Sequence, residues 1–150
     1  MYWECFLRMG IVYVPTTGVF QRGPLYLMME PVTVIPVSDS VALHRAFAET
    51  RARGNPKVSE SDVSDPSPPA VIKYAGVKTW RTFVRHADLW GIDERNGTYE
   101  IVGYRRDSPD GWVPDTTQAV VFPAGTTADE VIEHVIAILQ EAARRDQSSL

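Results

Sequence analysis

The chain has 150 residues, of which 44% are hydrophobic and 23% are charged, and its formal net charge at pH 7 is −4. This length and composition are typical of one globular domain with a core of its own. The acidic balance argues against a general nucleic-acid-binding protein, since such proteins obtain much of their affinity by neutralising phosphates.

The N-terminal residues and the single cysteine bear on the compartment. Cys5 is the only cysteine, so the chain forms no internal disulfide, which suits a reducing environment. Residues 1–14, MYWECFLRMGIVYV, carry Glu4 and Arg8 inside their apolar run and lack the pattern of a signal peptide. No apolar stretch approaches the ~20 residues that cross a bilayer. We therefore expect a cytoplasmic protein with no membrane partner.

The first part of the chain predicts two strands and a helix. Residues 10–15 and 25–36 are rich in β-branched and aromatic residues, and turn residues separate them. Pro31 cannot donate to a neighbouring strand, so it marks an edge, a bulge or a break. Residues 40–53 follow the start signal Ser38-Asp39, and Gly54 is placed as the helix cap. The helix puts one set of side chains on a single face: Leu43, Ala46, Phe47 and Thr50.

The middle of the chain predicts a loop, a short strand and a second helix. Residues 55–69 contain four prolines and several serines and aspartates, which is typical of an exposed loop. Residues 70–75, AVIKYA, predict a strand that ends at Gly76. Residues 77–87 then predict a helix whose apolar face includes Trp80, which we interpret as a core anchor.

A hairpin follows, because Asn96-Gly97 separates the strand-like runs 90–95 and 98–106, and both turn positions favour positive φ. Tyr99 and Ile101 fall on one face of the second run, and Glu100, Val102 and Tyr104 on the other. A loop at 107–115 and a strand at 117–123 complete this region. Trp112 in the loop is either packed back onto the core or offered to a partner.

The last helix is the best defined, since Thr127 and Glu130 form a capping box. Its apolar stripe is Val131, Ile132, Val135, Ile138, Leu139 and Ala142, and a polar tail is expected at 144–150. The order of elements predicts a single α+β domain with a mainly antiparallel sheet and about three helices packed on one face.

No motif in the sequence predicts a catalytic or cofactor site. HExxH, GxSxG and the glycine-rich phosphate loops are absent. The three histidines, His44, His86 and His134, do not have the spacing of metal ligands. We therefore expect neither a metal nor a cofactor, and no enzymatic activity.

Two alternatives to a protein without enzymatic activity stay open: a small enzyme and a nucleic-acid-binding module. A small enzyme would assemble its site from scattered residues, with Lys73, Tyr74, His86 and nearby carboxylates as candidates. A nucleic-acid-binding module would use the basic face of helix 78–86. The corresponding recognition patch combines five residues: Lys73, Tyr74, Lys78, Arg81 and Arg85.

Five stretches together resemble a known group of small bacterial proteins: VYVPTTG, MMEPV, ARGNPKV, KYAGVKTW and GTTADEVIEHVI. The group is that of immunity proteins of contact-dependent growth inhibition systems, and the resemblance spans roughly residues 10 to 140. It implies a cytosolic protein that binds the toxic C-terminal domain of a delivered effector, often a nuclease, and blocks it.

A protein-binding function agrees with the acidic charge, because an acidic inhibitor is steered toward a basic nuclease. We expect the partner to meet carboxylates of the 88–115 region together with neighbouring aromatic and basic side chains. The candidate partner-binding residues are Asp93, Glu94, Glu100, Tyr104, Arg105, Arg106, Asp107, Asp110 and Trp112.

Overall fold

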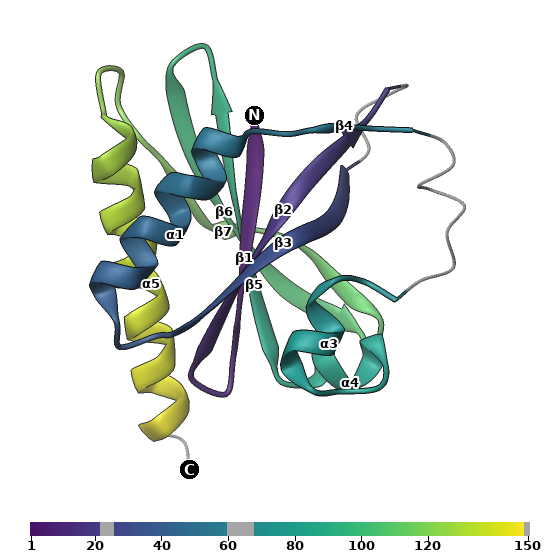
Figure 1. Cartoon of the computed structure of the whole chain (residues 1–150). Helices are drawn as coiled ribbons and strands as arrows, with labels where there is room; N and C mark the ends of the chain where they lie inside the picture. Colours follow the sequence, from purple (N-terminus) through teal and green to yellow (C-terminus); the bar gives the residue numbers. More distant parts are fainter. Residues whose placement is uncertain (22–25, 60–67, 149–150) are drawn as a thin grey trace.

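The computed structural model of the chain describes residues 1–21, 26–59 and 68–148 (Figure 1). The strands, in chain order, are β1 (Tyr2–Arg8), β2 (Ile11–Phe20), β3 (Tyr26–Pro36), β4 (Lys57–Val58), β5 (Ala87–Arg95), β6 (Thr98–Ser108) and β7 (Gly111–Val121). The helices are α1 (Ser40–Arg53), α3 (Val71–Ala75), α4 (Trp80–Arg85) and α5 (Ala128–Ser148).

These strands form one seven-stranded sheet with the order β3-β2-β1-β5-β6-β7, and β4 pairs with the end of β2. Neighbours along this order run antiparallel, and within the described ranges the parallel pair is β4 with β2. The predicted α+β fold with a mainly antiparallel sheet is therefore confirmed.

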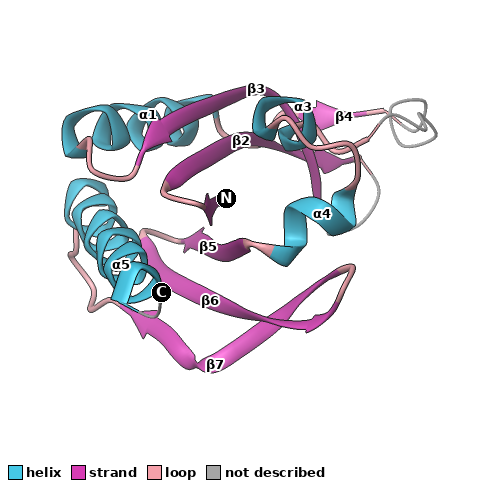
Figure 2. Ribbon diagram, turned by 90° about the horizontal axis from the view of Figure 1, so that it is seen from below, coloured by secondary structure: helices cyan, strands magenta, loops and turns pink. Residues whose placement is uncertain are grey.

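The two faces of the sheet carry separate hydrophobic clusters, because side chains alternate along a strand. Trp3, Cys5 and Leu7 of β1 belong to the cluster with α1 and α5. Phe6 belongs to the other cluster, where it packs against Phe83 of α4. Figure 2 shows the long helices and the short helices on opposite sides of the sheet. The structure thus differs from the expected placement of all helices on one face.

Local signals set the ends of helix α1 as predicted. The Asp39 side chain accepts a hydrogen bond from the Ala42 N–H at 3.0 Å and caps the N-terminus. Gly54 ends the helix with φ of 72°, and its N–H donates to the carbonyls of Thr50 and Arg51.

The capping box of α5 is also confirmed. The Glu130 N–H donates to Thr127 Oγ1 at 3.2 Å, and the Thr127 N–H donates to Glu130 Oε2 at 2.9 Å. The buried stripe includes Ile136, which was not predicted, whereas Ile138 is partly buried. Because α5 continues to Ser148, the expected polar tail at 144–150 is helical over its described part.

Two short segments differ from the prediction. β1 was not predicted, yet it is a central strand between β2 and β5. Residues Cys5 to Leu7 are buried on both faces, so they lack the polar alternation that marks a strand. Residues 70–75, predicted as a strand, contain helix α3. Val71 and Ile72 are adjacent and both buried, and so short an apolar run has no period that separates a helix from a strand.

The β-rich regions follow the turn signals only in part, since β2 continues to Phe20, beyond the strand expected at 10–15. Asn96 and Gly97 have φ of 52° and 76°, which confirms the predicted hairpin. β3 is an edge strand whose register with β2 shifts beside Pro31, as the proline predicted. The loop expected at 107–115 is instead a tight turn, since β7 already begins at Gly111 and Trp112 pairs with Arg106.

The segment 55–69, expected to be an exposed loop, begins with residues that pack on the sheet. Asn55 is half-buried, and Val58 of β4 is buried. Pro68 and Pro69 are exposed, and residues 60–67 lie outside the described residues.

Candidate functional site

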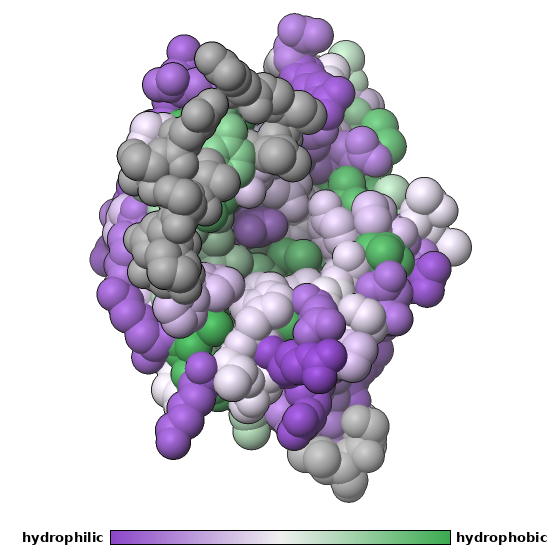
Figure 3. All heavy atoms as spheres, turned by 90° about the vertical axis from the view of Figure 1, so that its right-hand side faces the viewer, coloured by the Kyte–Doolittle hydropathy of each residue, from purple (hydrophilic) through white to green (hydrophobic). Residues whose placement is uncertain are grey.

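A hollow lies on the side of the sheet that carries α3 and α4. β1 and β2 pair from Phe6–Arg8 to Ile11–Tyr13. Toward Tyr2 the strands part, and the Asn55 Nδ2 bridges them by donating to the carbonyls of Tyr2 at 2.5 Å and of Thr17 at 2.8 Å. The hollow measures about 420 Å³. Figure 3 looks onto this side and shows hydrophilic and hydrophobic groups together at the bottom of a depression.

Four strands supply the lining of this hollow. The pairs come from β1, β3, β5 and β6 respectively: Tyr2 and Glu4, Tyr26 and Met28, Asp93 and Arg95, and Val102 and Tyr104. The alternation of side chains along β1 places Tyr2 and Glu4 on the same face as Phe6. The hollow is therefore a feature of the sheet surface itself.

The aromatic rings of the hollow are held by contacts around Tyr2. Its ring lies over Gly91, where a Cβ would come within 2.4 Å of the Tyr2 hydroxyl. The ring centroids of Tyr2 and Tyr26 are 4.9 Å apart. The Tyr2 hydroxyl donates to Glu4 Oε2 at 3.1 Å and lies 3.2 Å from the hydroxyl of Tyr104. A glycine on β5 thus makes room for a cluster of hydrogen-bonded side chains.

Burial changes the acid–base behaviour of this cluster. Desolvation raises the pKa of Glu4 to about 7, although the hydrogen bond from Tyr2 opposes the rise. Burial is also the largest cause of the raised pKa of Tyr2, and the nearby Glu4 carboxylate adds to it. Tyr2 therefore stays protonated and donates to a carboxyl group that titrates near neutral pH.

Further carboxylates stand at the rim. Arg95 Nε lies 2.9 Å from Asp93 Oδ2, and the Asp93 side chain is 24% exposed while that of Arg95 is 79% exposed. Glu100 pairs with Asp93 across β5 and β6 and is half-buried. Asp93, Glu100 and Tyr104, which were predicted from sequence, are thus brought to this region of the sheet.

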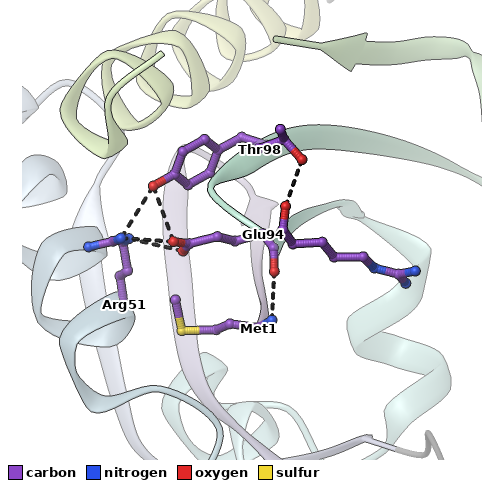
Figure 4. A network of polar contacts seen from close by, with 6 residues as sticks. Met1, Arg51, Glu94 and Thr98 are labelled. Carbon is purple, nitrogen blue, oxygen red and sulfur yellow. Dashed lines mark hydrogen bonds and ion pairs between the residues drawn. The ribbon is translucent and has the colours of Figure 1, made fainter. Parts of the chain in front are cut away.

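Glu94, also predicted as a partner-binding residue, lies elsewhere. Its carboxylate accepts two hydrogen bonds from Arg51, at 2.9 and 3.1 Å, and one from the Tyr99 hydroxyl at 3.2 Å (Figure 4). Its backbone carbonyl accepts a hydrogen bond from the amino group of Met1 at 2.7 Å. Tyr99 belongs to the cluster under α1 and α5. This network therefore lies on the face of the sheet opposite to the hollow, where it joins α1 to β5 and β6.

The remaining predicted residues lie on the far half of the β6–β7 hairpin. Trp112 packs against Phe6 with ring centroids 5.6 Å apart, and its Nε1 donates to the Ala87 carbonyl at 3.3 Å. It is therefore packed onto the core. Arg106 donates to backbone carbonyls at the end of α4 and pairs with Asp88 at 3.7 Å. The predicted residues of this hairpin that are exposed are Arg105, Arg106, Asp107 and Asp110.

The alternative basic patch is partly neutralised within the chain. Lys73 and Tyr74 of α3 both contact the Glu30 carboxylate of β3. Arg81 pairs with Asp110 at 2.7 Å, whose carbonyl also accepts from Trp80 Nε1. Two further members of the patch are exposed: Lys78 and Arg85.

The residues suggested for a small enzyme do not converge on the hollow. His86 is the C-terminal cap of α4 and is exposed, whereas Lys73 and Tyr74 lie on α3. None of the three lines the hollow described above. Across residues 1–21, 26–59 and 68–148, no three His, Cys, Asp or Glu side chains gather closely enough to hold a metal ion.

Sequence reasoning missed the residues at the centre of the hollow: Tyr2, Glu4, Tyr26 and Met28. In the sequence, Glu4 is a charge that interrupts an apolar run. Once β1 is placed between two other strands, a carboxylate inside such a run has to be at least partly buried. The available signal was therefore the position of Glu4, but it needed the strand assignment.

A second depression lies between α1 and α5. It measures about 520 Å³ and is lined by Ser40, Val41, His44, Arg45, Glu133 and Ile136. Val41 is 72% exposed, so this groove is open to solvent.

No helix in the described part of the chain is both long and apolar enough to cross a membrane.

Comparison with known proteins shows the fold. No family model matches the sequence, and no curated protein matches it. A protein of unknown function from Neisseria meningitidis is 15% identical, with a TM-score of 0.68 over 94% of this chain and 93% of that chain. A chain of the CdiA-CT/CdiI toxin and immunity complex from Yersinia pseudotuberculosis is 10% identical, with a TM-score of 0.63 over 95% of each chain. The chain is similar to both in fold, and a fold alone does not establish a function.

Proposed function

We propose that this chain is an immunity protein, which binds a cognate toxin domain and neutralises it by protein–protein interaction. One observation carries the proposal: nearly the whole chain shares its fold with a chain of a toxin and immunity complex. The resemblance of its sequence stretches to immunity proteins of contact-dependent growth inhibition systems supports the same function.

The charge of the chain supports a basic partner. The formal net charge is −4, and the carboxylates of Glu4 and Asp93 line the hollow, with Glu100 beside them. A toxin domain that cuts nucleic acid needs positive charge to hold phosphates. Opposite charges would speed the encounter of the two proteins. We therefore infer a nuclease-type toxin domain as the partner.

The size of the chain allows a tight complex. A stable interface buries about 800 Å² on each partner. The chain exposes 8562 Å², so such an interface would take about a tenth of its surface. An immunity protein of this size needs no additional domain to cover its partner.

The test is expression of this chain together with the toxin domain encoded beside its gene. We expect the toxin domain alone to stop growth, and the two chains together to restore growth and co-purify as a stable complex. The chain expressed alone should leave growth unchanged.

Two results would refute the proposal. If the chain alone arrests growth, it is the toxic component of such a pair. If it neither binds nor neutralises a toxic neighbouring domain, the shared fold serves another function.

A further inference from the structure

The hollow contains a carboxylate that lacks a positive partner within the described residues. Glu4 accepts a hydrogen bond from Tyr2, but in the ranges 1–21, 26–59 and 68–148 no Lys, Arg or His forms an ion pair with it. Buried charges in proteins are usually paired, because an unpaired charge is costly to remove from water. Among the described residues, Glu4 therefore has no counter-charge of its own.

The walls around Glu4 suit a cation that also has apolar atoms. Tyrosine faces attract cations, and a flat or linear cation gains from packing beside several rings. Tyr2, Tyr26 and Tyr104 surround the carboxylate, and Met28 and Val102 add apolar surface. The hollow of about 420 Å³ is large enough for one alkylammonium or guanidinium group with its carbon chain.

The chain already places one guanidinium at the rim. Arg95 pairs with Asp93, yet its side chain is 79% exposed, so it is held mainly in solvent. With Glu4 ionised, the described residues of the lining carry two carboxylates, from Glu4 and Asp93, and one guanidinium, from Arg95. Those residues thus have one negative charge in excess.

We propose that this hollow is a binding site for an organic cation, with Glu4 as its counter-ion and three tyrosines around it: Tyr2, Tyr26 and Tyr104. The cation is a guanidinium or primary ammonium group, carried either by a small molecule or by an Arg or Lys side chain of a protein partner. This site goes beyond the proposed neutralising function and does not depend on it.

The affinity of this site for a cation is higher when Glu4 is ionised than when it is protonated. Within the described ranges, the charged or titratable groups that face Glu4 are Tyr2 on β1, Tyr26 on β3, Asp93 and Arg95 on β5, and Tyr104 on β6. Burial raises the pKa of Glu4 to about 7, so a bound cation competes with a proton for this carboxylate. Binding therefore weakens as the pH falls through neutral and releases a proton when it occurs near neutral pH.

The test is a titration of the whole chain with ethylguanidinium, followed by the NMR shifts of the amides of Tyr2, Glu4 and Tyr104. We expect saturable shifts at about pH 8 with a dissociation constant on the order of 1 mM, typical of so small a ligand. N-ethylurea has nearly the same shape without the charge and serves as the matched probe, for which we expect no saturable shift.

Two variants locate the site. Glu4→Gln keeps the size of the side chain and an acceptor for Tyr2, and should weaken ethylguanidinium binding by about tenfold or more, because a charged hydrogen bond is lost. Glu133→Gln makes the same change of charge on the exposed surface of α5 and should leave binding unchanged. Thermal unfolding of each variant verifies that the fold is intact.

The proposal is overturned if ethylguanidinium produces no saturable shift, if N-ethylurea binds equally well, or if Glu4→Gln binds as the parent chain does. Repeating the titration on the complex with the toxin domain distinguishes the two sources of the cation, a small molecule and a partner side chain. Loss of probe binding there identifies a partner side chain in the hollow, and retained binding identifies a free small molecule. Because the first titration uses no toxin, its result is independent of the neutralisation test.

Discussion

At the scale of single residues, Glu4 is the least expected feature of the chain. It lies on β1 between Trp3 and Cys5, both of which are buried. Its carboxyl group faces the hollow and accepts a hydrogen bond from Tyr2. A carboxyl group in such a position is stable when protonated and costs free energy when ionised.

This predicts a pH-dependent effect of Glu4→Gln on stability. The folded chain holds the Glu4 proton up to about pH 7, whereas the unfolded chain releases it near the ordinary pKa of 4.5. The folded state thus binds more protons in this window, so the stability of the parent chain falls as pH rises from about 4.5 to 7. Gln is neutral throughout, and the variant should be more stable than the parent by up to about 3 kcal/mol above this window.

Chemical denaturation at about pH 5 and about pH 8 measures the difference. Parent and variant should have closer unfolding free energies at the lower pH and separate at the higher one. Glu133→Gln, on the exposed side of α5, is the matched control and should show no such separation. A gap between parent and Glu4→Gln that is the same at both pH values would contradict the prediction.

At the scale of elements, β7 carries an irregularity that depends on β6. Ile101 pairs with Val120 and Gly103 with Asp115, so β7 has extra residues between these two pairs. The Asp115 side chain holds this bulge by accepting from the N–H and Oγ1 of Thr117 and from Gln118 Nε2. Gln118 lies directly over Gly103.

Gly103→Ala is therefore expected to destabilise the chain. A Cβ at this position would lie 2.6 Å from the Cβ of Gln118, an atom fixed to the backbone, so the bulge would have to move. Overpacking of this kind costs about 1–3 kcal/mol. A lowered midpoint of thermal unfolding would verify the prediction.

Gly111→Ala is the matched substitution for this experiment. Gly111 begins β7 at the other end of the same hairpin, and a Cβ there meets no atom within 4 Å. We expect its unfolding midpoint to stay near that of the parent chain, with the gain of up to about 1 kcal/mol that a tolerated Gly-to-Ala change can bring. Equal midpoints for both variants would show that the bulge yields freely.

At the scale of the whole molecule, charge governs how a partner is met. The formal net charge of −4 is spread over a surface on which many charges are paired within the chain, such as Arg81 with Asp110 and Arg144 with Glu141. Exposed pairs of this kind add little stability. The excess carboxylates would attract a basic partner over a distance.

For the proposed complex with a basic toxin domain, we expect the association rate to fall as salt concentration rises, while the dissociation rate changes less. Stopped-flow mixing or surface binding at several salt concentrations measures both rates. An association rate that is independent of salt would exclude electrostatic steering and would favour a partner without a basic surface.

The sequence by itself determined the features that arise from contacts between near neighbours in the chain. Examples are the caps of α1 and α5, the Asn96-Gly97 turn and the packed faces of the two long helices. Each of these depends on side chains within a few residues of one another, whose spacing can be read directly. The acidic net charge belongs to the same class, since it is a sum over residues.

Only the tertiary structure decided the position of β1, the helical state of α3 and the hollow. β1 and α3 are short apolar segments whose local pattern is ambiguous. β1 is buried on both faces as a central strand, whereas Val71 of α3 packs into the cluster on one face of the sheet. The hollow joins Tyr2 to Tyr104 and Tyr26, which are far apart in the chain. Such contacts depend on strand order and register, and these are set by the packing of the whole core rather than by any local stretch.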